Sequence, residues 1–456
     1  MAKYREGASV GRLLIVAPSA FPLGGVANWL DYLVPGLSLL GWDIVVGLTS
    51  GQHNDVAAYL EQHPFPKVVS ISCGSGTQEG RLAGLSTAIR SVDPDIIAFT
   101  NLPDVCIAAG RLHARERIGN LARARVVLVN HGIQHDLFAD MRSLRLGLDA
   151  IVCTNRLATA LATEFGGIAA ARSFYCPCGT SVPAYRPALK LRAGQPLRVG
   201  YFGRYEQEQK RVFDLPKIAA ELDRRGFVYE FVLAGGGPDE MALQAAFADA
   251  TRSPVTFLGA VPAAEVGPRV LDRIDVMILT SDWETGPLVI WEGMAAGVPV
   301  VTSRYVGSGR EGSLIHGHNC LMFPIGDVGA AADLLVELAD PQKADVIAAH
   351  AFGLVKQHYS LKASVAGWDS ALRAISHLPM RTKDDWNAVV AGLSMPPAGR
   401  LDILLGRYSA ELVRVALGRR FAHSGPGGEW PHTLNAVDPR CPTFWGLAAA
   451  LDRSAA

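Results

Sequence analysis

The chain carries no excess of charge of either sign and few charged residues in all. Lys and Arg together number 43, as do Asp and Glu, and charged residues make up 19% of the 456 positions. Nucleic-acid-binding proteins generally carry a basic excess, so this class is not expected. The apolar fraction of 49% suffices for large buried cores and is unlike that of a disordered chain. The length favours two or three domains.

Cysteines are few and follow no metal-binding pattern. The seven are scattered, and Cys176 and Cys178 are separated by one residue instead of the two found in zinc and thioredoxin motifs. We therefore expect reduced, mostly buried thiols in a cytoplasmic protein, with no bound metal and no cofactor.

Long uninterrupted apolar stretches are absent as well. Residues 13–30 carry no charge, but Pro18, Pro22, Gly24 and Gly25 interrupt them, and the apolar core at 13–17 is too short for a signal peptide. A strand followed by a glycine turn explains this stretch better than a spanning helix. We expect a cytoplasmic protein, with peripheral contact to the inner membrane as an alternative.

Short apolar runs alternate with longer helical patterns along most of the chain. Runs of Val, Ile and Leu without polar alternation, separated by helices, are typical of parallel sheets covered on both faces. Two series of such strands predict two α/β domains. The first series is 12–17, 43–48, 67–72, 96–100, 126–130 and 150–154, and the second is 198–202, 229–234, 255–258, 276–279, 298–302 and 320–323.

The most informative segment runs from Ser281 to Val301 and contains Glu284 and Glu292. Eight residues span a little over two helical turns, so Glu284 is expected in a loop and Glu292 in the helix that follows. The start of a helix has unpaired N–H groups that suit a phosphate, and carboxylates accept hydrogen bonds from hydroxyl groups. Phosphate together with a polyol indicates a sugar nucleotide, although two glutamates at a helix start are also an ordinary surface feature.

A second segment, Tyr201 to Arg211, directly follows a predicted strand and contains Arg204 and Lys210. Breaking a sugar–diphosphate bond leaves negative charge on the departing nucleotide, and cations placed there stabilise the transition state. Arginine grips phosphate oxygens in a fork, whereas lysine acts as a point charge. The alternative is a basic surface loop.

Three glycine-containing segments complete the pattern. Gly24 and Gly25 lie in a turn where glycine tolerates positive φ and close approach of a ligand. His131 precedes a glycine at the end of a predicted strand, and Gly235 and Gly236 follow another and are candidates for exposed amides. Each segment is also compatible with an ordinary turn.

Taken in chain order (Gly24 and Gly25, His131, residues 201–211, Gly235 and Gly236, and residues 281–301), the five segments resemble glycosyltransferase family 4 (glycosyl transferases group 1), whose members are retaining, metal-independent enzymes. The resemblance covers roughly residues 10–375. It implies that Glu284 lies beside the donor sugar, that Glu292 holds the ribose hydroxyls, and that His131 lies beside the sugar being transferred. Arg204 and Lys210 would face the donor diphosphate.

The same resemblance implies an α/β fold of two Rossmann-like domains facing across a cleft, the GT-B fold, with an additional, mainly helical C-terminal extension. The expected parts are an N-terminal acceptor-side domain (1–180), a linker (181–195), a nucleotide-sugar-binding domain (196–360), a helix returning to the N-terminal domain (361–380) and an extension without assigned role (381–456).

The chain departs from the family pattern at two places. Gly286-Pro287 replaces the usual aromatic residue and glycine after the first glutamate, and because proline has no N–H, Leu288 and Val289 become the expected phosphate donors. Asn28 or a neighbour occupies a position where an acidic residue is common.

Three other patterns have more ordinary explanations. Residues 307–312 match G-x-G-x-x-G, but no long helix is expected after them, which argues against a dinucleotide site. A basic segment at 111–125 suits either anionic lipid or a solvated helix face. Residues 400–421 predict one amphipathic helix, and its arginines at 400, 407 and 414 are expected on the solvent-exposed face.

The sequence thus predicts a glycosyltransferase that moves a hexose from a UDP-, GDP- or ADP-linked sugar to a glycan, glycolipid or small-molecule hydroxyl. Two alternatives remain at this point. One is a sugar-nucleotide epimerase of the same fold, and the other is a catalytically silent sugar-nucleotide-binding protein.

Overall fold

A computed structural model of the chain contains two compact units. It describes residues 9–20, 24–52, 54–115, 124–191, 194–262, 265–392, 399–422, 428–434 and 437–454. Unit 1 comprises residues 1–154, 158–176 and 365–444, and unit 2 comprises residues 155–157, 177–364 and 445–456. Each unit is built around one parallel sheet.

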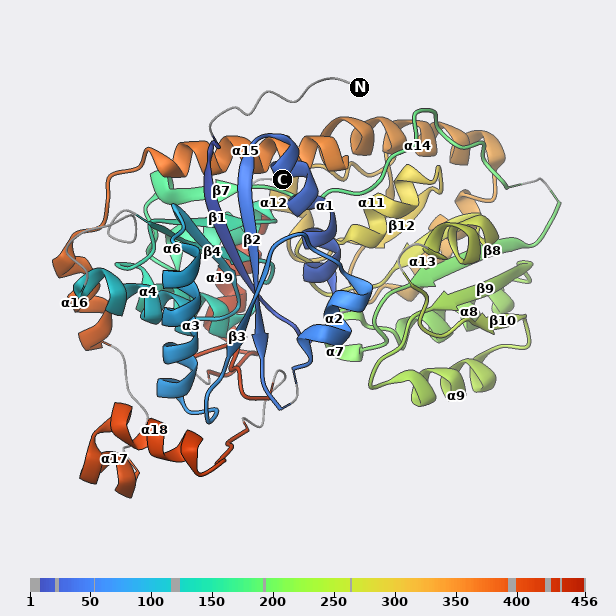
Figure 1. Cartoon of the computed structure of the whole chain (residues 1–456). Coiled ribbons are helices and arrows are strands. Elements are labelled where there is room, and N and C mark those ends of the chain that lie inside the picture. The colour runs from blue at the N-terminus through green and yellow to red at the C-terminus, as the bar shows by residue number, and fades with distance from the viewer. Residues whose placement is uncertain are drawn as a thin grey trace. The chain divides into compact units, whose positions relative to one another are not determined.

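Unit 1 contains a seven-stranded sheet in the order β3-β2-β1-β4-β5-β6-β7, with all neighbouring strands parallel. Its central strands are buried on both faces because their Val, Ile and Leu side chains meet helices on each side (Figure 1). The strands are β1 (Gly11–Pro18), β2 (Trp42–Ser50), β3 (Val68–Ser72), β4 (Ile96–Thr100), β5 (Arg125–Asn130), β6 (Ala150–Cys153) and β7 (Ser173–Tyr175).

The helices between these strands are crossover connections, as parallel pairing requires. In chain order they are α1 (Gly25–Leu39), α2 (Val56–Gln62), α3 (Gln78–Val92), α4 (Asp104–Arg115), α5 (His135–Leu144) and α6 (Arg156–Glu164).

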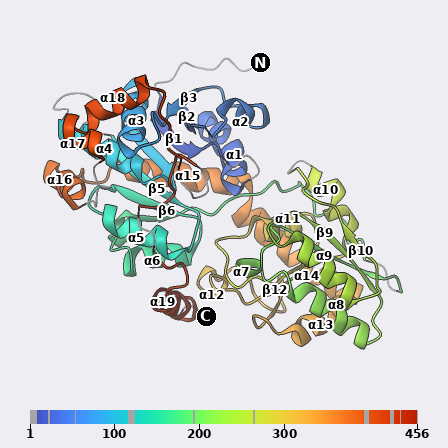
Figure 2. The same cartoon turned by 90° about the horizontal axis from the view of Figure 1, so that it is seen from below.

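Unit 2 contains a six-stranded parallel sheet in the order β10-β9-β8-β11-β12-β13. Its strands are β8 (Leu197–Phe202), β9 (Tyr229–Ala234), β10 (Val255–Phe257), β11 (Val276–Leu279), β12 (Val300–Ser303) and β13 (Leu321–Phe323). Its helices, seen from a second direction in Figure 2, are α7 (Gln207–Lys210), α8 (Asp214–Arg224), α9 (Glu240–Ala250), α10 (Val266–Arg269), α11 (Leu288–Ala295), α12 (Ser308–Glu311), α13 (Val328–Glu337) and α14 (Pro341–Leu354).

The predicted fold class is confirmed, and every predicted strand is present within two residues at each end. β7 was not predicted. Its sequence, Ser173-Phe-Tyr175, is short and only partly buried at the sheet edge, so it lacks the apolar run that identifies the other strands.

The C-terminal part continues with α15 (Leu361–Ser376), α16 (Lys383–Gly392), α17 (Arg400–Leu405), α18 (Arg407–Ala416) and α19 (Pro442–Arg453). Residues 365–444 cluster with unit 1. There α16 packs against α4 and buries Trp386, whose ring stacks on His113 with 4.9 Å between centroids.

The expectation of one continuous helix over residues 400–421 is wrong. The helix breaks at Gly406, which adopts φ 74° and ψ 153°, and the last residues to Phe421 are not helical. Glycine adopts this backbone conformation without steric cost, so it ends one helix and starts the next at a new angle.

We predict that Asp104→Ala destabilises unit 1. Asp104 begins α4 and pairs with Arg81 of α3 at 2.6 Å, with the two side chains 2% and 4% exposed. Removing one partner leaves a buried, uncompensated charge, which costs about 3–5 kcal/mol. Urea unfolding measures this loss. The exposed pair Arg269–Glu265 provides the control, because Glu265→Ala should cost at most about 1 kcal/mol. Equal effects of the two changes would contradict the prediction.

Candidate functional site

The turn between β8 and α7 contains Arg204. Gly203 adopts φ 149°, and the buried Tyr201 hydroxyl donates a hydrogen bond of 2.9 Å to the carbonyl of Arg204, which fixes the turn. The Arg204 guanidinium pairs with Glu206 at 2.5 Å and donates to the Gln209 side-chain oxygen at 2.8 Å. Its side chain is 54% exposed, so the cation faces solvent at the carboxyl end of the strand.

Lys210, at the end of α7, pairs with Glu284 of the loop after β11. The distance from Lys210 Nζ to Glu284 Oε1 is 2.6 Å, and the Ser281 hydroxyl donates to the same oxygen at 2.5 Å. Glu284 is buried and Lys210 is 17% exposed. A buried carboxylate requires such partners, so this pair ties α7 to the β11–α11 loop.

Gln209 links the two cations and was missed by the sequence analysis. Its side-chain N–H groups donate to Glu284 Oε2 at 3.4 Å and to the Trp283 carbonyl at 3.1 Å, while its oxygen accepts from Arg204. An amide has donors and an acceptor, so one buried Gln209 connects a carboxylate to a guanidinium. Its place between Arg204 and Lys210 was the available signal. The structure therefore brings Arg204, Lys210 and Glu284 together.

The loop after Glu284 turns directly into α11. Gly286 adopts φ 87°, and Pro287 precedes the first helical residue with φ −66°. The first intrahelical contact is the bond from the Ile290 N–H to the Pro287 carbonyl at 3.0 Å, so the amides of Leu288 and Val289 belong to the open first turn. These are the two amides that the sequence analysis selects as phosphate donors.

Glu292 lies on α11, in its second turn, and is partly buried. Within the described part of the chain, its carboxylate has no recorded hydrogen-bond or ion-pair partner. Burial raises its pKa to about 7 because the charged form is poorly solvated. Hydroxyl groups that donate to this carboxylate would supply the solvation it lacks.

The loop between β9 and α9 packs so closely on the β8–α7 turn at Gly235 that no side chain fits at this position. A Cβ atom on Gly235 would lie 1.9 Å from the Gly203 carbonyl oxygen. The Gly235 N–H donates to the Gly259 carbonyl at 2.8 Å, so the expectation that Gly235 exposes its amide is wrong. Gly236 differs, because a Cβ there would meet only the Glu240 side chain at 3.4 Å.

The segment that matches G-x-G-x-x-G forms α12, which ends after four residues. The structure thus lacks the long helix that a dinucleotide site needs after its glycines. Glu311 of this segment is buried and accepts a hydrogen bond from the Tyr359 hydroxyl at 3.0 Å and another from the Arg156 N–H at 2.9 Å. These contacts give Glu311 a structural role.

The last helix contributes to this part of unit 2, which the sequence analysis did not foresee. Asp452 accepts a hydrogen bond of 2.7 Å from the Arg310 N–H, and the ring of Trp445 lies 5.5 Å from that of Trp283. Trp283 directly precedes Glu284. Residues far apart in sequence thus pack next to the predicted donor-side loop.

Unit 1 contains the three remaining predicted residues. Gly24 precedes α1 with φ −98°, and neither Gly24 nor Gly25 has positive φ. The turn therefore does not use the tolerance of glycine for positive φ. A Cβ on Gly25 would meet nothing within 4 Å, so the turn has open space beside it. His131 contacts Trp29 edge-on at 5.0 Å, and burial lowers the pKa of His131 to about 4, so its imidazole is neutral at physiological pH.

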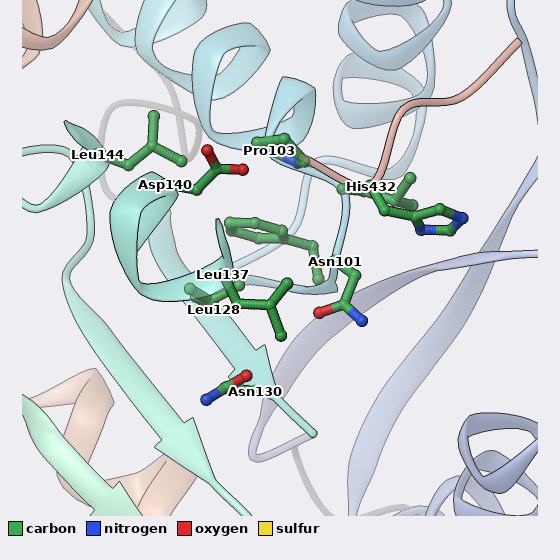
Figure 3. Close-up of a pocket in the computed structure, with 10 residues that line it drawn as sticks. Asn101, Pro103, Leu128, Asn130, Leu137, Asp140, Leu144 and His432 are labelled. Carbon is green, nitrogen blue, oxygen red and sulfur yellow. The ribbon is translucent and has the colours of Figure 1, made fainter. Parts of the chain in front are cut away.

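A small pocket with an enclosed volume of about 20 Å³ lies at the carboxyl ends of β4 and β5 in unit 1 (Figure 3). Leu128, Leu137 and Leu144 give it apolar walls, and Asn101, Asp140 and His432 add polar groups. Asn101 adopts φ 43°, and Asn130, which also lines the pocket, immediately precedes His131.

The sequence predicts neither a metal site nor a membrane-spanning helix. In residues 9–454 with their gaps, no group of three or more His, Cys, Asp or Glu side chains is arranged to hold a metal ion. No helix in the described ranges has the length and apolar character to cross a membrane. The basic segment at 111–125 lies largely outside the described residues.

Residues 196–340 match the family model described as glycosyl transferases group 1. The chain is 33% identical over 168 residues to the amylovoran biosynthesis glycosyltransferase AmsK of Erwinia amylovora, which covers 35% of this chain and 40% of the relative. It is 30% identical over 180 residues to 2-deoxystreptamine glucosyltransferase of Streptomyces kanamyceticus, and this match covers 37% of this chain and 46% of the relative. The chain spans less than half the length of the curated relatives it matches.

Solved glycosyltransferase structures have a similar fold over most of the length of this chain. HepE from Anabaena, in complex with UDP and glucose, matches with a TM-score of 0.64 at 19% identity, covering 80% of this chain and 99% of the other. Sucrose-phosphate synthase from Thermosynechococcus elongatus matches with a TM-score of 0.63 at 17% identity, and the match covers 79% of this chain and 98% of the other. The fold is therefore that of GT-B glycosyltransferases. Within it, residues 196–340 form a glycosyl transferases group 1 domain.

We predict that Glu292→Gln stabilises the protein at pH 8 but not near pH 4.5. Between 4.5 and about 7 the unfolded chain releases this proton while the folded chain keeps it, so the wild type loses stability as pH rises. The variant avoids this loss and should gain roughly 1–3 kcal/mol at pH 8.

Urea unfolding at the two pH values measures the difference. Glu208→Gln, on an exposed position of α7, controls for the change in net charge. A gain of the same size at both pH values would show that burial of the Glu292 charge is not its source.

Proposed function

We propose that the chain is a retaining glycosyltransferase that moves a hexose from a nucleotide-diphosphate sugar to a hydroxyl acceptor. The observation that carries the proposal is the connected group of Arg204, Gln209, Lys210 and Glu284. This group lies inside the segment that matches the glycosyl transferases group 1 model. UDP-, GDP- and ADP-linked sugars all fit this proposal.

Arg204 and Lys210 would stabilise the negative charge that develops on the leaving diphosphate. The Arg204–Glu206 pair is more than half exposed on the arginine side, and such pairs are weak, so the guanidinium can turn to a phosphate at little cost. Lys210 keeps its charge close to Glu284 and is already held in place. With two cations at the diphosphate, we propose that transfer needs no metal ion and no cofactor.

The remaining residues would bind the rest of the donor. Leu288 and Val289 would offer their amides to the diphosphate, with Gly236 and Gly286 allowing close approach. Glu292 would accept hydrogen bonds from the ribose hydroxyls. Glu284 would orient the sugar through Oε2, which receives the long 3.4 Å bond from Gln209 and no other from the residues that the structure describes.

In the proposed reaction, the acceptor oxygen bonds to the anomeric carbon on the face from which the diphosphate departs, and the donor phosphate takes the acceptor's proton. Placement of the two substrates supplies much of the rate in such a mechanism. His131, neutral at physiological pH, would contribute hydrogen bonding beside the transferring sugar instead of charge. Gly24 and Gly25 would complete this side.

The setting we propose is polysaccharide, glycolipid or glycoconjugate synthesis in the cytoplasm, with peripheral contact to the inner membrane. The Erwinia amylovora relative is called an amylovoran biosynthesis glycosyltransferase, and the Streptomyces kanamyceticus relative a 2-deoxystreptamine glucosyltransferase. These names support transfer to a glycan or to a small molecule.

The donor site is tested by a thermal-shift screen of nucleotides and sugar nucleotides, followed by product analysis. A ligand at about 100 times its Kd adds roughly 2.7 kcal/mol of stability, so a bound sugar nucleotide should raise Tm visibly. Arg204→Met should weaken binding about tenfold and lower turnover by about 10²-fold, because it removes one cation from the diphosphate. Arg204→Lys should recover part of both losses.

Lys217→Met, which removes an exposed cation from α8, is the matched control and should leave both quantities unchanged. Binding of no sugar nucleotide, or return of the donor as an epimer without transfer, would contradict the proposed function. A product whose anomeric configuration is opposite to that of the donor would contradict retention.

We also propose that the pocket in Figure 3, which has room for about one water-sized group, receives a single hydroxyl group at the edge of the acceptor. Leu137→Trp should fill it and raise the KM for the acceptor at least about tenfold, while sugar-nucleotide binding stays unchanged. Leu39→Trp, at a position 74% exposed on α1, is the control for the added ring. Unchanged acceptor kinetics in Leu137→Trp would refute this placement.

A further inference from the structure

The helices α17 and α18 are attached to unit 1 by one buried carboxylate. Glu411 of α18 accepts hydrogen bonds from the Ser75 N–H at 2.7 Å, the Ser75 hydroxyl at 2.6 Å and the Thr77 hydroxyl at 2.5 Å. The Phe421 N–H also donates to the Ser75 carbonyl at 2.7 Å. Figure 1 shows α18 next to the end of α3, which it contacts. This attachment uses only one face of the helix.

Large apolar side chains are exposed on both helices and on the residues that follow α18. Eight of the nineteen exposed large hydrophobic side chains among the described residues fall within residues 403–421. Leu404 is 78% exposed, Ile403 76%, and Tyr408 64%. We call this set the α17–α18 apolar face, and it consists of Ile403, Leu404, Leu405, Tyr408, Leu412, Val415, Leu417 and Phe421.

The charge of the same segment is basic. Residues 399–422 contain five arginines (400, 407, 414, 419 and 420) against the two acids Asp402 and Glu411. Both acids are engaged within the protein, Asp402 with Arg414 at 2.7 Å and Glu411 in its buried site. Arg400 and Arg419 are exposed. The apolar face is therefore accompanied by positive charge that is not balanced locally.

A protein surface seldom leaves so many large apolar side chains together in water. An apolar face combined with arginines is the pattern of helices that lie in the plane of a bilayer, where the side chains enter the acyl boundary and the cations meet anionic headgroups. α17 and α18 have 6 and 10 residues, too few to span a bilayer, so they suit the surface.

We propose that the α17–α18 apolar face docks unit 1 on a membrane surface that contains anionic lipid. This inference deepens the peripheral membrane contact of the proposed function by naming the surface that makes it. It does not depend on catalysis, because it is argued from the exposure and charge of residues 399–422. It assigns a role to a part of the C-terminal extension. The arginines at 400, 407 and 414 do not form one stripe on a single helix, because the helix breaks at Gly406 and Arg414 pairs with Asp402.

The test is co-sedimentation of the full chain with vesicles, either of phosphatidylcholine alone or of phosphatidylcholine and phosphatidylglycerol in equal parts. The wild type should bind the anionic vesicles, and binding should weaken with added salt. The double variant Leu404→Glu/Leu412→Glu should lower the partition coefficient at least about tenfold, because it places two charges on the apolar face. Arg400→Ser/Arg419→Ser should reduce binding to the anionic vesicles specifically.

Met241→Glu/Val346→Glu is the matched control. These side chains are 85% and 55% exposed on α9 and α14, and the variant should bind vesicles as the wild type does. All substituted positions are exposed, so Tm should remain within a few degrees of the wild-type value.

Absence of wild-type binding to anionic vesicles would overturn the proposal. Equal binding by the Leu404/Leu412 variant, or equal binding to both kinds of vesicle, would do the same. Sedimentation analysis covers a further outcome. A wild-type dimer that the glutamate variant converts to a monomer would identify the face as an interface between two copies and overturn the membrane assignment.

Discussion

The buried carboxylate of Glu284 determines how the turn after β8 and the loop after β11 are arranged in unit 2. A buried charge must be neutralised and hydrogen-bonded, and Glu284 meets this requirement through Lys210, Ser281 and Gln209. Gln209 in turn holds Arg204. The turn after β8 and the loop after β11 are thereby fixed against each other, and the segment after β8 holds two cations, Arg204 and Lys210, beside the loop after β11.

Glu292, unlike Glu284, has a carboxylate without hydrogen-bond donors among the described residues. It lies in the second turn of α11, whereas Glu284 lies in the loop before that helix. Burial raises the pKa of Glu292 to about 7. The fold therefore bears an electrostatic cost at this position that a ligand with hydroxyl groups would relieve. Two glutamates in one motif thus have different physical roles. Glu284 stabilises the loops, whereas the Glu292 carboxylate receives no hydrogen bond from the residues that the structure describes.

The C-terminal extension contributes to both units by different means. In unit 1, α16 buries Trp386 against α4, and Glu411 anchors α18 at the turn before α3. In unit 2, Asp452 accepts from Arg310 and Trp445 packs on Trp283, beside Glu284. The extension is therefore part of the folded core of each unit, while its α17–α18 face supplies a surface that the α/β sheets do not have.

The sequence by itself determined the two parallel sheets, since buried Val, Ile and Leu runs and the helices between them are local patterns. It also singled out Arg204, Lys210 and Glu284, which the structure connects, and Glu292, because their spacing from a strand end or a helix start is local too; their roles in binding stay predictions. Only the tertiary structure decided the bridging role of Gln209, the packing of Asp452 and Trp445, the paired amide of Gly235 and the exposure of the apolar face on α17 and α18. Each of these depends on contacts between residues far apart in the chain, or on which side of a helix is covered, and neither can be derived from the order of side chains along one segment.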